Sequence, residues 1–255
     1  MTVLELYRAL DARYPASLSC PWDNDGLMIC PDPDREVKRV LFALDATEKT
    51  VAEAVRIGAD VLITHHPMLF RPLKSVTPLT LSGSRALSAL SGSLAVMSFH
   101  TRLDAADGGV NDALCETIGL PVVGTFGDEE CPTLGRIGVL PLSMAGVDFA
   151  ACVRSFLGAP SVRLTGDRNV HRVAVVGGDG KDLIAAAIAA GADTLLTGDA
   201  SYNAVLDAAE SGLNVIEAGH YFTEAPVLAV LADVVQPLTG AEVHFADSNR
   251  TTEIR

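Results

Sequence analysis

Basic residues are scarce in this sequence. Lysine and arginine together number 19, against 32 aspartates and glutamates, which gives a formal net charge of −13 at pH 7. A chain with this charge repels phosphate backbones and anionic lipid head groups. We therefore expect neither a nucleic-acid-binding protein nor a protein that works on a membrane surface.

Long apolar runs are also missing, although the mean hydropathy of +0.30 is high. The longest helix-like apolar run, Leu183 to Ala192, has about half of the roughly 20 residues that a membrane-spanning helix needs. Residues 1–15 carry charges among their apolar side chains, unlike a signal peptide. These absences predict a cytoplasmic protein whose surplus apolar residues fill a large core or subunit interfaces.

Paired cysteine motifs are absent too. The chain has five cysteines, an odd number, and no two of them form a C-x-x-C pair. This pattern argues against a disulfide framework and against a structural zinc site.

What the sequence does contain is an alternation of buried strands and helices. Apolar residues at helical spacing predict a helix over 3–13. Short runs that are apolar throughout, as in strands covered on both faces, predict strands at 40–44, 61–63, 94–97, 173–176, 194–196 and 214–216. Helical patterns lie between them at 46–57, 181–190 and 202–211. The alternation indicates an α/β fold.

An internal repeat organises the chain. Residues 37–64 align without a gap with residues 170–197, and ten of the positions are identical: Val37, Arg39, Val40, Ala52, Ala54, Gly58, Ala59, Asp60, Leu62 and Thr64. Each copy has the pattern of a strand–helix–strand unit. We therefore expect two similar three-layer α/β/α domains that arose by duplication and are intertwined. The N-terminal half would span about 1–126 and the C-terminal half about 127–255.

The first candidate site segment is the pair His65-His66, which directly follows the predicted strand 61–63. The carboxyl ends of strands are where α/β proteins build their sites. The second copy has Gly198-Asp199 at the corresponding positions, so the fold itself does not require the histidines. A histidine pair alone is a weak signal.

Two further segments share one spacing. His100 and Asp104 follow one predicted strand, and His220 and Glu224 follow another, each pair four residues apart. On a helix this spacing puts both side chains on one face, which suits metal ligation. Taken singly, Asp104 is better explained as a helix cap and His100 as the partner of an ordinary hydrogen bond. Matching pairs from both halves nevertheless favour a common metal centre.

Two glycine-containing turns complete the candidates. The turn Trp22-Asp23-Asn24-Asp25-Gly26 holds the only tryptophan, and it could line a pocket or cap the first helix. The turn Gly177-Gly178-Asp179-Gly180 lies between a strand and a helix but does not match G-x-G-x-x-G. A dinucleotide site is therefore disfavoured.

The combined ligand set is His65, His66, Asp104, His220 and Glu224. It mixes nitrogen and oxygen donors without thiolates, which is typical of sites with open coordination positions. Five ligands exceed the three of one catalytic zinc and fit two divalent ions about 3.5–4 Å apart, bridged by a carboxylate. Such a centre activates a water as nucleophile, with His100 as the candidate catalytic proton carrier or as a residue that orients a metal ligand. These ligands do not distinguish zinc, iron, manganese, nickel and cobalt.

The sequence resembles the Nif-three-like dinuclear-metal-centre proteins, also known as type 2 homologues of GTP cyclohydrolase I. The resemblance rests on WDNDGL (22–27), THHPMLF (64–70), HTRLDAADGGVND (100–112), GADTLLTGD (191–199) and GHYFTE (219–224), in this order. It implies two intertwined α/β domains, a toroidal homohexamer and two metals per chain. It also implies the five ligands named above, with Asp104 and Glu224 as the bridges.

Two positions depart from the family pattern. Arg102 stands where family members usually carry Asn, and Asn203 stands where they carry His. We expect Arg102 to place a cation beside the metal pocket, where it would hold an anionic substrate or close the pocket. Asn203 would remove a histidine from the pocket.

Two functions of different classes follow. One is a metal-dependent hydrolase of a small, nucleotide-like substrate, and the family name suggests opening of the guanine imidazole ring of GTP. The other is a non-catalytic metal-binding or protein-interaction ring, acting as a scaffold, metal store or regulator. A ring threaded on DNA is disfavoured by the charge of −13.

Overall fold

The computed structural model describes residues 1–246, so the end of the predicted C-terminal half, 247–255, lies outside the described residues. The chain divides into two compact units. The first consists of Met1–Leu103 together with the segment that starts at Leu228, and the second is Asp104–Val227. The boundary between duplicated halves near residue 126 stays a prediction.

The first unit is built on a five-stranded sheet with the order β1-β4-β3-β2-β11. Its strands are β1 (Gly26–Ile29), β2 (Arg39–Ala43), β3 (Val61–Thr64), β4 (Ala95–Ser98) and β11 (Glu242–Phe245). All neighbours are parallel except β1, which runs antiparallel to β4. The helical elements are α1 (Val3–Arg13), η1 (Ala16–Leu18), α2 (Glu48–Ile57), α3 (Leu81–Ser91) and parts of α4 (Thr101–Ala105) and α10 (Pro226–Thr239).

The second unit has a six-stranded sheet with the order β5-β6-β8-β9-β10-β7. Its strands are β5 (Val122–Phe126), β6 (Gly135–Ala145), β7 (Arg163–Thr165), β8 (Asn169–Asp179), β9 (Thr194–Asp199) and β10 (Asn214–Glu217). Only β8, β9 and β10 are parallel to one another. The helical elements are α5 (Val110–Thr117), α6 (Gly146–Leu157), η2 (Lys181–Leu183), α7 (Ile184–Ala189), α8 (Tyr202–Glu210) and α9 (His220–Glu224).

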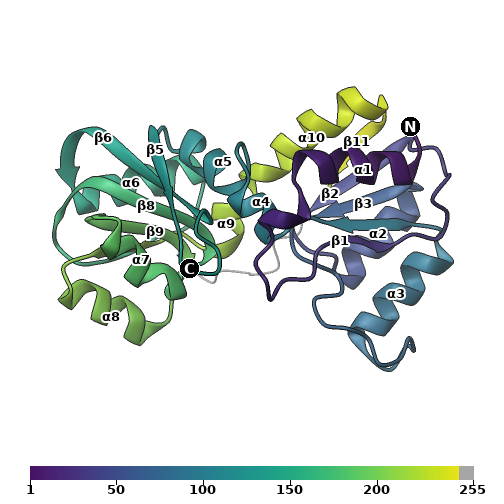
Figure 1. Cartoon of the computed structure of the whole chain (residues 1–255), viewed down its shortest axis with the longest axis horizontal. Coiled ribbons are helices and arrows are strands. Elements are labelled where there is room, and N and C mark those ends of the chain that lie inside the picture. Colours follow the sequence, from purple (N-terminus) through teal and green to yellow (C-terminus); the bar gives the residue numbers. More distant parts are fainter. Residues whose placement is uncertain (247–255) are drawn as a thin grey trace. The chain divides into compact units, whose positions relative to one another are not determined.

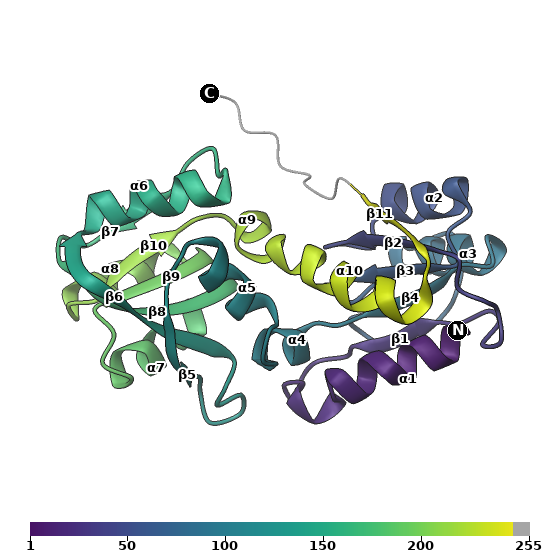
Figure 2. The ribbon, with the colours of Figure 1, turned by 90° about the horizontal axis from the view of Figure 1, so that it is seen from above.

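Helices cover both faces of each sheet. Figure 1 shows α1 and α10 on one side of the first sheet and α3 on the other. In the second unit, alternate residues of β9 point to opposite faces. Leu196 packs in a cluster with Phe149 of α6, whereas Leu195 packs with Ala187 of α7 and Val205 of α8. Figure 2 shows α6 beside β7. The predicted α/β class with two helix-covered sheets is confirmed.

The two copies of the repeat have the same local structure. Val40 pairs with Val61 in the first copy, and the corresponding Val173 pairs with Thr194 in the second. The helix of the first copy ends at Gly58 with φ of 69°, and Gly191 has φ of 74° in the second. Glycine takes up such positive φ values without steric cost. This residue-by-residue agreement of strand pairing supports a duplication.

The strands and helices predicted from the sequence are present, with bounds that differ by at most four residues. Val3–Arg13 is helical as expected, and each predicted apolar run lies in or overlaps a strand. Within residues 1–246, no helix combines the length and the apolar character needed to cross a bilayer.

Candidate metal centre

Three histidines gather at the carboxyl ends of neighbouring strands in the first unit. His65 and His66 follow β3, and His100 follows β4. One ring nitrogen of each lies within 4.8 Å of those of the other two. Donors about 2.1 Å from one ion lie within about 4 Å of one another, so this spread is close to that of a bound ligand set. A divalent transition metal held by His65 and His66 would therefore lie close to His100.

The backbone of the histidine pair is held in place by the end of β2. The His65 and His66 amides donate to the carbonyls of Ala43 and Leu44, at 3.3 and 2.8 Å. The Thr64 hydroxyl donates to the His66 carbonyl at 2.8 Å. These contacts fix the backbone of the pair at the carboxyl end of β3.

Each histidine ring of the cluster is oriented through Nδ1. His65 contacts the Phe99 carbonyl at 2.8 Å. Aspartates hold the other two rings at 2.9 Å: Asp45 contacts His66, and Asp23 contacts His100. Metal-binding histidines commonly engage their second nitrogen in this way, so Nε2 is the nitrogen through which His65 and His66 would coordinate. In His100, Nε2 is the nitrogen that would exchange a proton.

The turn at 22–26 supports His100 and does not cap the first helix, whose C-cap is Tyr14. Asp23 accepts hydrogen bonds from the Thr101 amide and hydroxyl at 3.0 and 2.6 Å. Burial raises the pKa of Asp23, but the contacts with His100 and Thr101 outweigh it and lower the pKa to about 2. Asp25 accepts from the His100 amide at 3.1 Å.

Arg102 lies inside the first unit, so the expectation that it reaches a substrate is wrong. Its guanidinium donates to both oxygens of Asp25 at 2.6–3.0 Å and to Asp11 at 2.7 Å. Its side chain is only 3% exposed. Burial lowers the pKa of Arg102, but the two carboxylates outweigh it and raise it. Arg102 therefore anchors the turn that holds His100.

The second unit places His220 and Glu224 together on α9. His220 Nε2 lies 3.2 Å from Glu224 Oε1, and the Glu224 side chain is 5% exposed. Asp199, at the end of β9, contacts His220 Nδ1 at 3.0 Å. This aspartate corresponds in the repeat to His66, so the second copy supplies an orienting carboxylate where the first supplies an imidazole.

Two glycines leave room for this pair. A Cβ at Gly178, whose φ is +66°, would lie 2.3 Å from Glu224 Oε1 and 3.2 Å from His220 Nε2. A Cβ at Gly198 would lie 2.8 Å from the His220 Cα. The close approach of α9 explains why the second copy has glycine where the first has His65.

The other two positions singled out in the sequence lie on two further helices. Asp104 is half-buried on α4, and its backbone carbonyl accepts from Asn111 at 3.2 Å. Its place in the ligand set stays a prediction. Asn203 is exposed on α8. The two four-residue spacings are offset by one: His220 opens α9, whereas His100 precedes α4.

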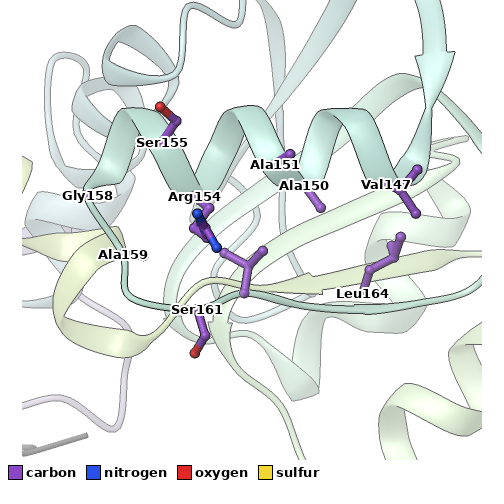
Figure 3. A pocket seen from close by; sticks show the side chains of 10 residues that line it. Val147, Ala150, Ala151, Arg154, Ser155, Gly158, Ala159, Ser161 and Leu164 are labelled. Atoms are coloured by element: carbon purple, nitrogen blue, oxygen red, sulfur yellow. The ribbon is translucent and has the colours of Figure 1, made fainter. Parts of the chain in front are cut away.

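Two hollows lie in the second unit. A smaller one of about 270 Å³ is lined by Asp199, Gly219, Phe222 and the ion pair of Arg163 with Glu217. A larger one of about 670 Å³ lies between α6 and the segment before β7. Figure 3 shows Arg154 and Ser161 at this second hollow among small and apolar side chains. Ser161 and Val162 line both hollows.

The chain belongs to the Duf34/NIF3 (NGG1p interacting factor 3) family, whose model matches residues 1–252. A Clostridium perfringens protein described as a GTP cyclohydrolase 1 type 2 homolog is 32% identical, over 99% of this chain and 98% of its own length. A Streptomyces coelicolor protein of the same description is 37% identical, over 87% and 81%. The crystal structure of a hypothetical Staphylococcus aureus protein, 27% identical, matches with a TM-score of 0.90 over 100% of this chain and 99% of its own.

Proposed function

We propose that this protein is a dinuclear metal-dependent hydrolase of a small, nucleotide-like substrate. The observation that carries the proposal is the cluster of His65, His66 and His100, whose rings are all held through Nδ1. The residues that would hold the metals are His65, His66, Asp104, His220 and Glu224. The relatives' description as GTP cyclohydrolase homologues supports a nucleotide-like substrate.

Two divalent ions bound by this set would polarise the scissile bond and lower the pKa of a water molecule. The chain's own residues orient the ligands and transfer the proton. Asp45 and Asp199 keep the rings of His66 and His220 in one orientation. His100, held by Asp23, carries a proton from the attacking water to the leaving atom.

Metal analysis combined with turnover tests this proposal. Protein purified without chelator or nickel resin should contain about two equivalents of divalent metal per chain by plasma mass spectrometry. Metal-loaded protein should turn over at least one member of a nucleotide panel that includes GTP. Asp104→Ala and Glu224→Gln should abolish turnover, while Asp207→Asn, a change on α8, should leave it intact.

The hydrolase is contradicted if fully metal-loaded protein turns over none of the panel. One equivalent or less, unchanged after reloading, would contradict the dinuclear centre.

The second candidate is a non-catalytic partner-binding ring, which the word "interacting" in the family's description favours. It predicts partner binding that survives removal of the metals by chelation. Both candidate functions include a toroidal homohexamer, and light scattering in solution would measure the number of chains in the assembly.

A further inference from the structure

Two exposed aromatic side chains stand beside the three-histidine cluster of the first unit. Trp22 is 53% exposed and Phe70 is 44% exposed. Their ring centroids are 6.3 Å apart with an interplanar angle of 65°. Both rings also contact His100, at 6.2 and 6.4 Å between centroids. The aromatic pair is therefore continuous with the candidate metal ligands.

The loops that carry the two rings are tied together. Asn24 donates a side-chain hydrogen bond to the Leu69 carbonyl, which joins the residues next to Trp22 and Phe70. The Asp23 amide donates to the Cys20 carbonyl, and the Cys20 amide donates to the Thr101 hydroxyl, both at 2.9 Å. A surface fixed in this way loses little entropy when it binds a ligand.

Exposure increases outward from the cluster. His65 is fully buried, and His66 and His100 are half-buried. Trp22 and Phe70 follow as the exposed members. Because the two rings are steeply inclined, a flat ring stacked on one of them meets the other edge-on, and both are favourable aromatic geometries.

The residues after Phe70 add positive charge. Arg71 and Lys74 are exposed in the irregular segment between β3 and α3. Arg71 directly follows Phe70 and Lys74 lies three residues further along the chain, so in a protein with a net charge of −13 this segment favours a ligand that carries an anionic group.

We propose that Trp22 and Phe70 form a stacking site for the planar heteroaromatic ring of the substrate, with the ring's anionic substituent toward Arg71 and Lys74. The ligand class is thus a heteroaromatic ring that bears phosphate. This site specifies the substrate of the proposed hydrolase. That the bound ring is a substrate rests on the proposed function, whereas binding of the ring does not. It assigns a role to the only tryptophan of the chain.

Because Trp22 is the only tryptophan, its intrinsic fluorescence reports on this site alone. Metal-loaded protein is titrated with GMP and, separately, with ribose 5-phosphate, which carries the same phosphate but no ring. Excitation at the red edge of the tryptophan band limits absorption by guanine. We expect saturable quenching by GMP and none by ribose 5-phosphate.

Calorimetry on variants supplies the second readout. Stacking on one aromatic side chain is worth about 1–3 kcal/mol, so Trp22→Leu and Phe70→Leu should each weaken GMP binding about ten-fold. Trp22→Phe should keep most of the affinity. Phe156→Leu, at a 60% exposed aromatic on α6, is the matched control and should have no effect. Metal content should be unchanged in all four variants.

The stacking site is overturned if GMP and ribose 5-phosphate act alike, or if the leucine variants bind GMP as the unchanged protein does. It is also overturned if Trp22 emission responds to protein concentration and not to GMP, since a second copy would then cover the rings. GMP binding through Trp22 without turnover of any nucleotide would contradict the hydrolase alone. Turnover with an unchanged KM in Trp22→Leu would contradict the stacking site alone.

Discussion

Arg102 is a buried cation whose removal leaves a buried anion behind. Its main partner, Asp25, has a side chain that is 3% exposed. Taking away one member of a buried pair costs about 3–5 kcal/mol, because the other charge stays desolvated. We expect Arg102→Asn to lower the free energy of unfolding by about 3 kcal/mol in urea or guanidinium titrations.

The control for this change is Arg56→Asn. Arg56 is 71% exposed and lies 4.0 Å from Glu53, so its loss should cost under about 0.5 kcal/mol. Equal effects of the two substitutions would show that Arg102 does not anchor the turn.

Gly178 matters for the space it leaves beside Glu224. In Gly178→Ala the new Cβ would lie 2.3 Å from Glu224 Oε1, so the carboxylate must move. We expect this variant to fold but to lose a large part of its bound metal, as measured by plasma mass spectrometry after gel filtration.

Gly108→Ala separates this effect from backbone strain. Gly108 has a φ of +70°, close to that of Gly178, but a Cβ there would meet nothing within 4 Å. The two variants should therefore share a similar conformational cost, while only Gly178→Ala loses metal. Unchanged metal content in both would argue against Glu224 as a ligand.

Cys115 makes the free energy of unfolding fall as the pH rises through the alkaline range. Burial, and then the nearby carboxylate of Asp112, raise the pKa of Cys115 from 9.0 to about 12. Above pH 9 the unfolded thiol ionises while the folded thiol keeps its proton, so this contribution to stability is present below pH 9 and is lost as the pH rises toward 12.

Between pH 9.5 and 11 the unchanged protein should lose about 1 kcal/mol per pH unit more than Cys115→Ala does. Other groups titrate in the same range in both proteins, so the difference in slope isolates Cys115. Parallel slopes in denaturant titrations at several pH values would refute this.

At the scale of the element, each copy of the repeat uses one aspartate to hold the backbone of its first strand. Asp60 accepts from the amides of Lys38 and Arg39 at 2.7 and 2.9 Å. In the second copy, Asp193 accepts from the amides of His171 and Arg172 at 3.0 and 2.8 Å. The same side chain thus closes the same strand–helix–strand unit twice.

We expect Asp60→Ala and Asp193→Ala each to destabilise the protein by about 1–3 kcal/mol, because amides that were paired lose their acceptor. Asp60→Ala should cost more, since Asp60 also pairs with Arg35 at 2.7 Å. Hydrogen exchange of the four amides would show the loss locally. Unchanged protection of these amides would contradict the equivalence.

Whether the sequence predicts a strand depends on how far the strand is buried by the helices and strands around it. The central strands β2, β3, β8, β9 and β10 are mostly buried, and so they form the apolar runs that predicted them. The strand β5 is exposed at its first four residues and gives no such signal. The short strands β7 and β11 each lie at the edge of their sheet, and none of their residues is fully buried. They therefore form no apolar run that the sequence could reveal.

The histidines and the glutamate of the candidate site could be predicted from the sequence, but the aspartates that orient the histidine rings could not. His65 and His66 in the first unit, and His220 and Glu224 in the second, follow apolar strands, so each of these two pairs could be expected from the sequence. The aspartates that orient them, Asp45 and Asp199, are common residues whose role depends on which strand ends are neighbours. Arg102 was misjudged because its partners, Asp11 and Asp25, lie more than 70 residues away in the chain.

At the scale of the whole molecule, the net charge of −13 makes a prediction about nucleic acids. Affinity for duplex DNA comes mainly from cations that displace counterions. We expect no retardation of a DNA duplex at low salt, tested with the metal-loaded protein and with a basic protein as positive control. Binding that weakens steeply with added salt would contradict this.

The pairing of β11 with β2 has a consequence for biosynthesis. Glu242 pairs with Arg39, and the ring of Phe245 lies 5.8 Å from that of Phe42, so the first sheet is completed by nearly the last residues described. During translation the β2 edge stays open while the entire second unit emerges from the ribosome. An open edge can pair with other chains. A nascent chain of this protein therefore carries an unpaired β2 edge until β11 has been synthesised, and a chaperone that covers this edge would protect it from pairing with other chains.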